Sequence, residues 1–360
     1  MSSIWGDNLK ISLFGESHGA GVGVVIDGMP AGVKVDFEFV EAEMKRRAPG
    51  SGNTDGLVTS RKEPDKPEVL SGIHEENTTG SPICVIVRNT NTKSEDYKDF
   101  KNIPRPSHAD YTGTLRYNGM NDIRGGGHFS ARVTAGLVFA GALAKLVLKD
   151  RDIHIGSHLK SVHTVEDISF DNNTLSAPYF SILRDMRIPV INEFAGRHME
   201  EAILSAKLDK DSVGGVIETA VIGFPAGCGN PFFDSVESKL AHMLYSIPGV
   251  KGVEFGAGFD ISQMYGSDAN DTFYFDDGIV KTKTNHSGGI NGGITNGMPI
   301  VFKTALKPTP SIAMVQDTVD LKNKKDTMIE IGGRHDPCIA VRAVPIVEAA
   351  TAICMLDVLL

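Results

Sequence analysis

The sequence predicts an α/β sandwich, in which mainly antiparallel sheets surround central helices and the chain is built from pseudo-repeated units. Two observations favour this fold over a doubly wound sheet. Strand-like and helix-like segments follow one another irregularly, without the strict βαβ alternation that a parallel sheet requires. Segment 130–150 has the spacing of a long helix with apolar residues all around it, which predicts a helix buried at the centre of the molecule.

A sequence echo supports the idea of repeated units. Segments 23–33 (GVVIDGMPAGV), 215–227 (GVIETAVIGFPAG) and 289–300 (GINGGITNGMPI) are each β-rich, bounded by glycine, and carry Gly-Met-Pro or Gly-Phe-Pro near their ends. Chance similarity among glycine-rich strands is the alternative interpretation. No low-complexity linker divides the chain, so we expect one pseudo-symmetric domain over residues 1–360.

The predicted helices carry start and stop signals. Segment 37–47 (FEFVEAEMKRR) has helical spacing and a basic end, and Pro49 and Gly50 stop it. Ser130 is a good N-cap for the central helix over 130–150. Further helical patterns cover 196–210, 234–247 and an apolar C-terminal segment, 345–360. Runs rich in β-branched residues predict strands over 22–27, 69–73, 82–88, 214–222, 252–259 and 299–305.

Composition and charge argue against several classes of protein. The formal net charge of −9 and the pI near 5.7 disfavour a nucleic-acid-binding protein, because such proteins are usually basic. The first residues, MSSIW, lack the basic and apolar regions of a secretory signal, and we see no apolar run of the ~18 residues that span a bilayer. The four cysteines lie far apart without a C-x-x-C pair, which is typical of reduced thiols in a cytoplasmic protein.

Residues 15–19 (GESHG) fit the G-x-S-x-G pattern of a hydrolase nucleophile elbow. That elbow needs a strand, a sharp turn and then a helix. The residues after Gly19 are glycines and β-branched residues, which predict a second strand instead. The motif also lies near the N-terminus, which leaves no room for the preceding strands of a hydrolase sheet. We therefore disfavour Ser17 as a nucleophile, and a plain glycine turn with a surface histidine is an alternative.

Five further segments combine glycine or proline with cationic, histidine and hydroxyl side chains: RPSHAD (105–110), RGGGHFSAR (124–132), HSGGINGG (286–293), KPTPS (307–311) and GGRHDP (332–337). A glycine loop that leads into a helix, as at 124–132, presents backbone N–H groups to an anion. Each signal is weak alone, but together they predict a site for a polyanion beside acid–base groups. His18 and His108 are the expected acids, because histidine can donate a proton near neutral pH.

Metal and dinucleotide sites are not predicted. The sequence contains no H-x-H or H-E-x-x-H motif. His154 and His158 are spaced i, i+4 but lack a third ligand nearby, and we interpret them as a surface feature. A G-x-G-x-x-G fingerprint after a strand is also absent.

Taken together, the motifs resemble those of the chorismate synthase family. The resemblance rests on GESHG, RRAPG, SRKEPD, LSG…TTGSPI, RPSHADYTG, RGGGHFSAR, NHSGGINGGI, LKPTPSI and GGRHDPC…RAVPIVEA, which follow the family's order from near the N-terminus to the last helix. Membership would imply a 1,4-anti elimination of phosphate from 5-enolpyruvylshikimate 3-phosphate, giving chorismate. It would also imply reduced FMN as an obligatory cofactor without net redox change, an α/β sandwich, and a homotetramer.

The resemblance also implies roles for individual residues. His18 would protonate the departing phosphate, His108 would protonate the reduced flavin, and Asp336 would help the flavin accept the proton lost from the ring. The implied substrate contacts are Ser17, Arg47, Arg105, Arg132 and Arg334. The implied FMN contacts are His128, Phe129, Ser130, Pro248, Gly249, Gly292, Lys307, Pro308, Thr309, Pro310, Ser311 and Arg334. Arg47 is in addition an implied contact for NADP.

Four departures from the family pattern affect these expectations. Ser107 stands where the usual RPGHAD has glycine, His128 and then Phe129 stand where an arginine usually follows the three glycines, and Pro248-Gly249 replaces Asn-Ala. Segment 50–55 (GSGNTD) lacks the arginine that generally follows RR-x-PG, so one anion contact is missing or supplied elsewhere. The sequence leaves open whether NADPH or an outside reductant reduces the flavin. A serine hydrolase and a non-enzymatic nucleotide-binding protein are the competing functions.

Overall fold

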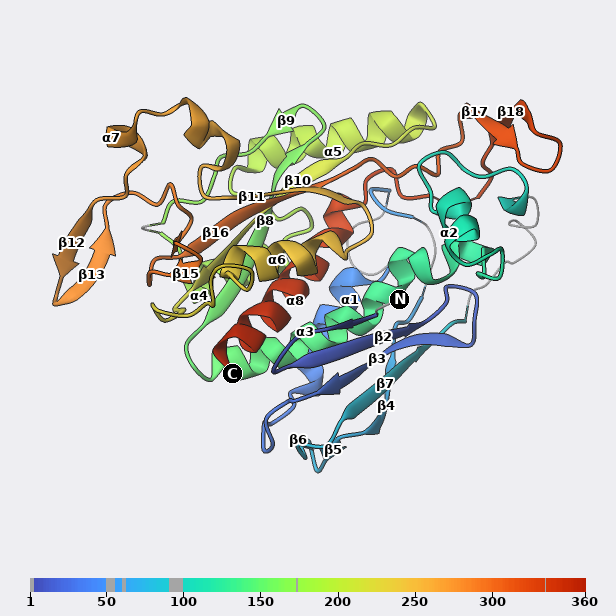
Figure 1. Ribbon diagram of the computed structural model, residues 1–360. Coiled ribbons are helices and arrows are strands. Elements are labelled where there is room, and N and C mark those ends of the chain that lie inside the picture. The colour runs from blue at the N-terminus through green and yellow to red at the C-terminus, as the bar shows by residue number, and fades with distance from the viewer. Residues whose placement is uncertain (1–2, 50–55, 60–62, 91–99, 173, 334) are drawn as a thin grey trace.

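Two five-stranded antiparallel sheets face each other across a layer of helices in the computed structural model (Figure 1), which describes residues 3–49, 56–59, 63–90, 100–172, 174–333 and 335–360. In the first sheet the strand order is β1 (Ile4–Trp5), β2 (Lys10–Gly15), β3 (Gly21–Asp27), β7 (Ile83–Arg88) and β4 (Pro67–Ser71). In the second it is β11 (Val250–Phe255), β16 (Ile300–Leu306), β10 (Gly215–Ile222), β8 (His154–Val162) and β9 (Val165–Glu166). The predicted sandwich of antiparallel sheets around central helices is therefore confirmed.

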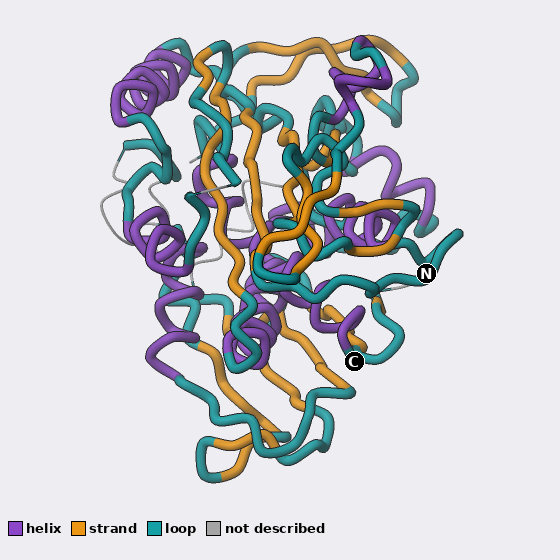
Figure 2. The backbone as a smooth tube through the Cα atoms, turned by 90° about the vertical axis from the view of Figure 1, so that its left-hand side faces the viewer, coloured by secondary structure: helices purple, strands orange, loops and turns teal. Residues whose placement is uncertain are grey.

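Two long apolar helices, α3 (Thr134–Lys149) and α8 (Ala340–Leu359), form the middle of the helical layer. They pack along each other, α3 against strands of the first sheet and α8 against strands of the second. In Figure 2 the purple helices accordingly lie between the orange strands of the two sheets. A Cβ added to Gly141 would lie 2.3 Å from the Cβ of Ala349, so the absence of a side chain there lets the two helices approach this closely.

The other elements are shorter or lie at the edges of the layers. The remaining helices are α1 (Phe37–Arg47), α2 (Asp110–Arg116), α4 (Ala177–Asp185), α5 (Glu193–Leu208), α6 (Val236–Tyr245) and α7 (Gly266–Ala269), with 3-10 turns η2 (Arg124–Phe129), η3 (Ala131–Val133) and η4 (Gly258–Gln263). The two-stranded pairs are β5–β6 (Ile73–His74 and Asn77–Thr78), β12–β13 (Phe273–Asp276 and Ile279–Thr282), β14–β15 (Ile290–Asn291 and Ile294–Thr295) and β17–β18 (Val315–Asp320 and Lys325–Glu330).

The first two segments of the sequence echo occupy equivalent places. Segment 23–33 contains most of β3, and segment 215–227 contains β10, and each of these strands is the middle strand of its five-stranded sheet. The third segment, 289–300, forms the short β14–β15 pair and leads into β16. The first two similar segments thus form the central strands of the two sheets, whereas the third forms a hairpin that leads into the second sheet.

The five predicted helices and six predicted strands are present; α1 has the predicted bounds, and the other elements have shifted ends. The largest shift is in α8, which begins at Ala340 and contains Pro345, where the sequence predicted the helix to start. Proline cannot donate a hydrogen bond and normally marks a helix start, but here burial of nearly every residue of α8 outweighs that preference. The central helix is preceded by η3, and Ser130 caps this turn by accepting from the Arg132 amide. Among the elements that were not predicted are β2, β8, α2 and α4.

The prediction that His154 and His158 form a surface feature is wrong for His158. Both residues lie on β8, and the side chain of His158 is fully buried. Its Nε2 lies 2.8 Å from a carboxylate oxygen of Glu218, and its Nδ1 lies 3.3 Å from Asp167. Burial alone would lower the pKa of His158, but the two carboxylates raise it, so the ring and its partners form a buried ion cluster.

The helix over Ala131–Lys149 is long and apolar enough to cross a membrane by length and composition. However, 78% of its most apolar window is buried inside the molecule, between α8 and the first sheet. Its apolar character is therefore explained by its place in the core.

We predict that His158→Gln destabilises the fold by about 3–5 kcal/mol, because it leaves two buried carboxylates without their cation. Since the folded pKa of His158 is raised, its contribution is full below about pH 6.5 and is lost as the pH rises through the folded value. Urea unfolding at pH 6 and pH 9 should show this loss in the wild type and not in His158→Gln. The control is His154→Gln on the same strand, and an equal effect of both substitutions would contradict the prediction.

Candidate active site

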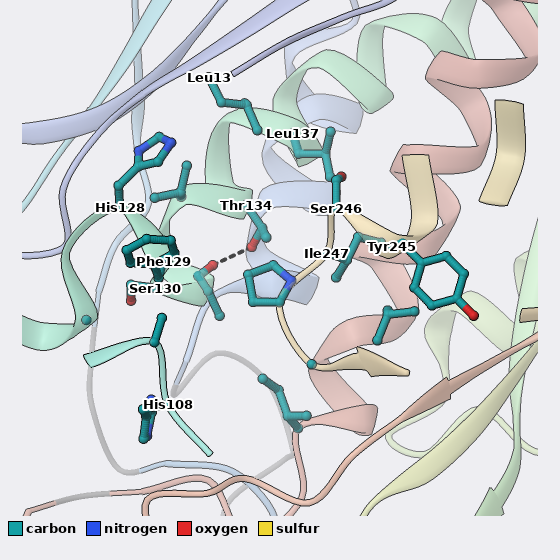
Figure 3. Close-up of a pocket in the computed structure, with 18 of the residues that line it drawn as sticks. Leu13, His108, His128, Phe129, Ser130, Thr134, Leu137, Tyr245, Ser246 and Ile247 are labelled. Carbon is teal, nitrogen blue, oxygen red and sulfur yellow. Dashed lines mark hydrogen bonds between the residues drawn. The ribbon is translucent and has the colours of Figure 1, made fainter. Parts of the chain in front are cut away.

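A cavity of about 760 Å³ lies at the N-terminal ends of α3 and α8. Its volume is in the usual range of small-molecule sites. Figure 3 shows one wall formed by His128, Phe129 and Ser130, and the facing wall formed by Tyr245, Ser246 and Ile247. Leu13 and Leu137 lie toward one end and His108 toward the other, so the cavity has an apolar end and a polar end.

The GESHG turn joins β2 to β3 and packs on the glycine turn η2. The Ser17 amide donates to the Gly127 carbonyl at 3.1 Å. A Cβ added to Gly125 would lie 2.5 Å from Cδ2 of His18 and 2.7 Å from Oγ of Ser17, so this position needs glycine. Gly125 lines the cavity while Ser17 and His18 are buried directly behind it. A strand follows the turn, as the sequence predicted, and the strand–turn–helix of a nucleophile elbow is not formed.

His108 is the polar centre of the cavity. Its Nε2 lies 2.6 Å from Oγ of Ser311, within hydrogen-bond distance. On the same loop Arg105 forms a buried ion pair with Asp110 at 2.8 Å. Burial, and then the positive charge of Arg105, lowers the pKa of His108 to about 4, so its ring is neutral at pH 7. A bound anion would favour the protonated ring and raise this pKa.

Two lysines make one part of the wall cationic. Lys307 follows β16, and its amide donates to the Gly249 carbonyl at 2.9 Å, while its ammonium group donates to the Ser107 carbonyl at 2.7 Å. Lys251 lines the same cavity from β11. Burial, and then the charge of Lys251, lowers the pKa of Lys307. Two lysines on one wall, one of which lowers the pKa of the other, favour the binding of an anion there.

Asp336 lines the cavity just before α8 and is held from two sides. The guanidinium of Arg342 donates to it at 2.9 Å, and the Thr59 amide donates to its Oδ1, also at 2.9 Å. Arg342 in turn donates through Nε to the Arg47 carbonyl at 3.2 Å. The carboxylate therefore has a fixed position, as an acid–base group requires.

Arg47 and Arg132 meet at a single carboxylate, that of Asp65. Burial would raise the pKa of Asp65, but the two guanidinium groups hold it below its usual value. Arg132 also donates to Oδ1 of Asn89 at 3.0 Å. Burial lowers the pKa of Arg47 to about 10, with Arg342 among the neighbouring charges that lower it further. Arg47 is buried and Arg132 is half-buried, neither lines the cavity, and the carboxylate of Asp65 already pairs with both guanidinium groups.

The structure brings most of the predicted site residues to this one cavity. Those that line it are His108, His128, Phe129, Ser130, Pro248, Gly249, Lys307, Pro308, Thr309, Pro310 and Asp336. Those that do not line it are Ser17, His18, Arg47, Arg105, Arg132, Gly292 and Ser311. Gly292 lies in the β14–β15 turn, and neither of these two strands lines the cavity. Arg334 lies outside the described residues.

The sequence analysis missed three residues that shape the site. Asp65 neutralises two arginines, Arg342 fixes Asp336, and Lys251 shares a wall with Lys307. Asp65 and Arg342 belong to the quoted motifs SRKEPD and RAVPIVEA, so the signal was present. Their roles depend on contacts between distant segments, which a motif alone does not specify. Lys251 directly follows the Pro248–Val250 turn, and only the pairing of β11 with β16 places it beside Lys307.

The charged and titratable groups of the cavity suit an anion and proton transfer rather than a metal ion. Among the described residues, no three histidine, cysteine, aspartate or glutamate side chains are grouped so that they could hold a metal ion. The cavity instead combines a neutral histidine, a fixed carboxylate and a pair of lysines. Such a set suits acid–base chemistry on a phosphorylated or carboxylated small molecule.

Three comparisons with known proteins find similarity to one family over nearly the whole chain. A family model described as chorismate synthase matches residues 9–360. The chain is 46% identical to "Chorismate synthase" of Pyrococcus abyssi, over 98% of this chain and 96% of that one, and 45% identical to that of Phocaeicola vulgatus, over 99% and 97%. A solved structure titled "Crystal Structure of Chorismate Synthase" superposes with a TM-score of 0.77 at 28% identity, covering 99% of this chain and 92% of that chain. The chain therefore belongs to the chorismate synthase family, a family of lyases.

Proposed function

We propose that the chain converts 5-enolpyruvylshikimate 3-phosphate to chorismate by a 1,4-anti elimination that depends on reduced FMN. The reaction removes a proton and a phosphate from the ring and leaves a new double bond. The observation that carries the proposal is one cavity in which His108, Asp336 and Lys307 meet, in a chain of this family. A substrate with one phosphate and two carboxylates suits such a cationic, acid–base site.

The residues of the cavity fit a flavin mononucleotide. Its volume is adequate, its walls carry Leu13, Phe129 and Ile247 for a planar ring, and Lys251 and Lys307 suit a phosphate. When bound, reduced FMN would supply the electron density that helps the phosphate to leave. The loop 307–310 and the Pro248-Gly249 turn are joined by the hydrogen bond between the Lys307 amide and Gly249, so they would hold the cofactor together.

Three side chains of the protein have separate proposed roles in proton transfer. His18, behind Gly125, is the group we propose to protonate the departing phosphate. Neutral His108 would take up a proton only after an anion enters, because its pKa of about 4 rises when an opposite charge is near. Asp336, fixed by Arg342, is the carboxylate we propose to assist the removal of the proton from the substrate ring.

Three of the proposed substrate arginines already form ion pairs with carboxylates of the protein itself. Arg47 and Arg132 bind Asp65, and Arg105 binds Asp110. Substrate binding would therefore exchange one carboxylate for another at Arg132 or Arg47 rather than fill open cations. Ser17 would add a polar contact beside His18.

The wider biochemical setting follows from the family. We propose a role in the biosynthesis of chorismate and aromatic amino acids, in the cytoplasm, by one domain that assembles as a homotetramer. NADPH is a potential reductant of the flavin, with Arg47 as its proposed contact. Neither a membrane nor a nucleic acid is a proposed partner.

We predict that chorismate and phosphate form in equal amounts with reduced FMN under anaerobic conditions, and that neither forms with oxidised FMN. The elimination has no net redox change, so the flavin should remain reduced after many turnovers. Absorbance of the flavin and assays of both products measure this directly. Oxidation of one flavin per chorismate would contradict a catalytic role, and flavin binding without phosphate release would favour the non-enzymatic alternative.

We predict that Lys307→Ala raises the dissociation constant of reduced FMN by about 10- to 100-fold, because it removes a charged contact with the phosphate. Flavin fluorescence titration under anaerobic conditions measures the constant. Lys303→Ala is the matched control, since Lys303 lies on β16, the strand that leads to Lys307, but pairs with Glu254 and does not line the cavity. Similar constants for the two variants would place the phosphate elsewhere.

We predict that Ser311→Ala lowers kcat and shifts the acidic limb of the pH profile, with the FMN dissociation constant nearly unchanged. The reason is that the Ser311 hydroxyl contacts His108 and does not line the cavity. Nitrogen NMR of the His108 ring should show a changed tautomer balance. Ser212→Ala is the control, because Ser212 donates to the Thr309 carbonyl in the same loop at 2.7 Å. A weaker flavin complex with an unchanged His108 signal would contradict this role.

A further inference from the structure

A second cavity, of about 430 Å³, lies between α1, the end of α4 and the first turns of α8. We name it the basic pocket, because its cationic lining residues are Lys45, Arg46, Arg184, Arg187 and Arg342. Five cations around one cavity are unusual in a chain with a net charge of −9. None of these five cations lines the candidate active site.

The carboxylates that balance these cations lie mostly behind the walls of the basic pocket. Glu43 and Glu348 are buried among α1, α3 and α8, where both bind Arg46 and Lys145. Glu200 lies 3.6 Å from Arg187. Asp185 is the single carboxylate in the lining, and its side chain is 77% exposed. The interior of the pocket therefore faces cations, and its potential favours an anion.

The rest of the lining is apolar. Met186, Pro189, Val341, Val344 and Pro345 form this surface, and all of them are buried or half-buried. Inorganic ions gain nothing from such a surface, whereas an organic body loses water on contact with it. We propose that the basic pocket binds a small organic carboxylate with an apolar body, at a site separate from the candidate active site.

Arg342 connects the two cavities. It lines the basic pocket, and its guanidinium also holds Asp336 at 2.9 Å, in the wall of the candidate active site. An anion in the basic pocket competes with Asp336 for the same guanidinium. Occupancy of the pocket is thus coupled to the charge environment of Asp336, and the coupling is reciprocal.

The test is direct binding of 3-phenylpropionate to the full chain, measured by calorimetry without flavin or substrate. We expect saturable binding with one site per chain, and no binding of the neutral 3-phenylpropanamide. The double variant Lys45→Gln/Arg187→Gln removes two exposed rim cations and should weaken binding about tenfold or more. The matched control, Lys149→Gln/Arg151→Gln, removes the same charge from exposed positions outside the pocket.

Three outcomes would overturn the proposal. Equal binding of the acid and the amide would show that the cations do not contribute. Unchanged affinity in the rim variant, or loss of binding in Lys307→Ala, would place the ligand in the active-site cavity. Absence of binding at millimolar concentration in a folded chain would mean that the pocket holds no such ligand or that another copy of the chain covers it. None of these measurements uses chorismate formation, so their outcome does not depend on whether the proposed function is correct.

Discussion

The packing of α3 against α8 is the constraint on which the rest of the structure depends. Gly141 and Ala349 set the spacing of the two helices, and each helix carries one of the two sheets. Both helices begin at the cavity, where Ser130 precedes one and Asp336 precedes the other. The partial positive charge of two helix N-termini therefore adds to that of the lysines in favouring an anion. One contact between apolar helices thus sets the spacing within the helical layer and helps to place both helix N-termini at the cavity.

The same helical layer contains buried charges. Glu43 of α1 and Glu348 of α8 share the cations Arg46 and Lys145. Although burial opposes ionisation, Lys145 and then Arg46 lower the pKa of Glu43 to about 2, so the carboxylate is charged. Such a cluster adds little to stability compared with an apolar core, because each charge loses its water. It does require one relative placement of α1, α3 and α8, since any other arrangement would leave a buried charge unpaired.

Local patterns in the sequence were sufficient to predict the layers, and the family resemblance identified part of the cavity wall. The apolar segment around α3 and the strand after GESHG were predictable because each signal is contained in a few consecutive residues. The environment of His158 was not, because its partners Asp167 and Glu218 come from other segments. The roles of Asp65 and Arg342 could not be predicted either, because each depends on a contact that its motif does not specify. A motif identifies the functional residues of a family. Tertiary contacts decide whether a cationic side chain can bind a ligand or already forms an ion pair within the protein.

The carboxylate of Asp65 between Arg47 and Arg132 acts as a resident counter-ion. A ligand anion at these two guanidinium groups would have to displace that carboxylate, so the number of unpaired charges would change little between the free and the bound protein. Association that depends on open cations weakens strongly as ionic strength rises, because mobile ions screen them. Here one carboxylate would replace another beside guanidinium groups that have little exposure to solvent. The affinity of this site for anions should therefore be far less sensitive to salt than a count of its arginines suggests.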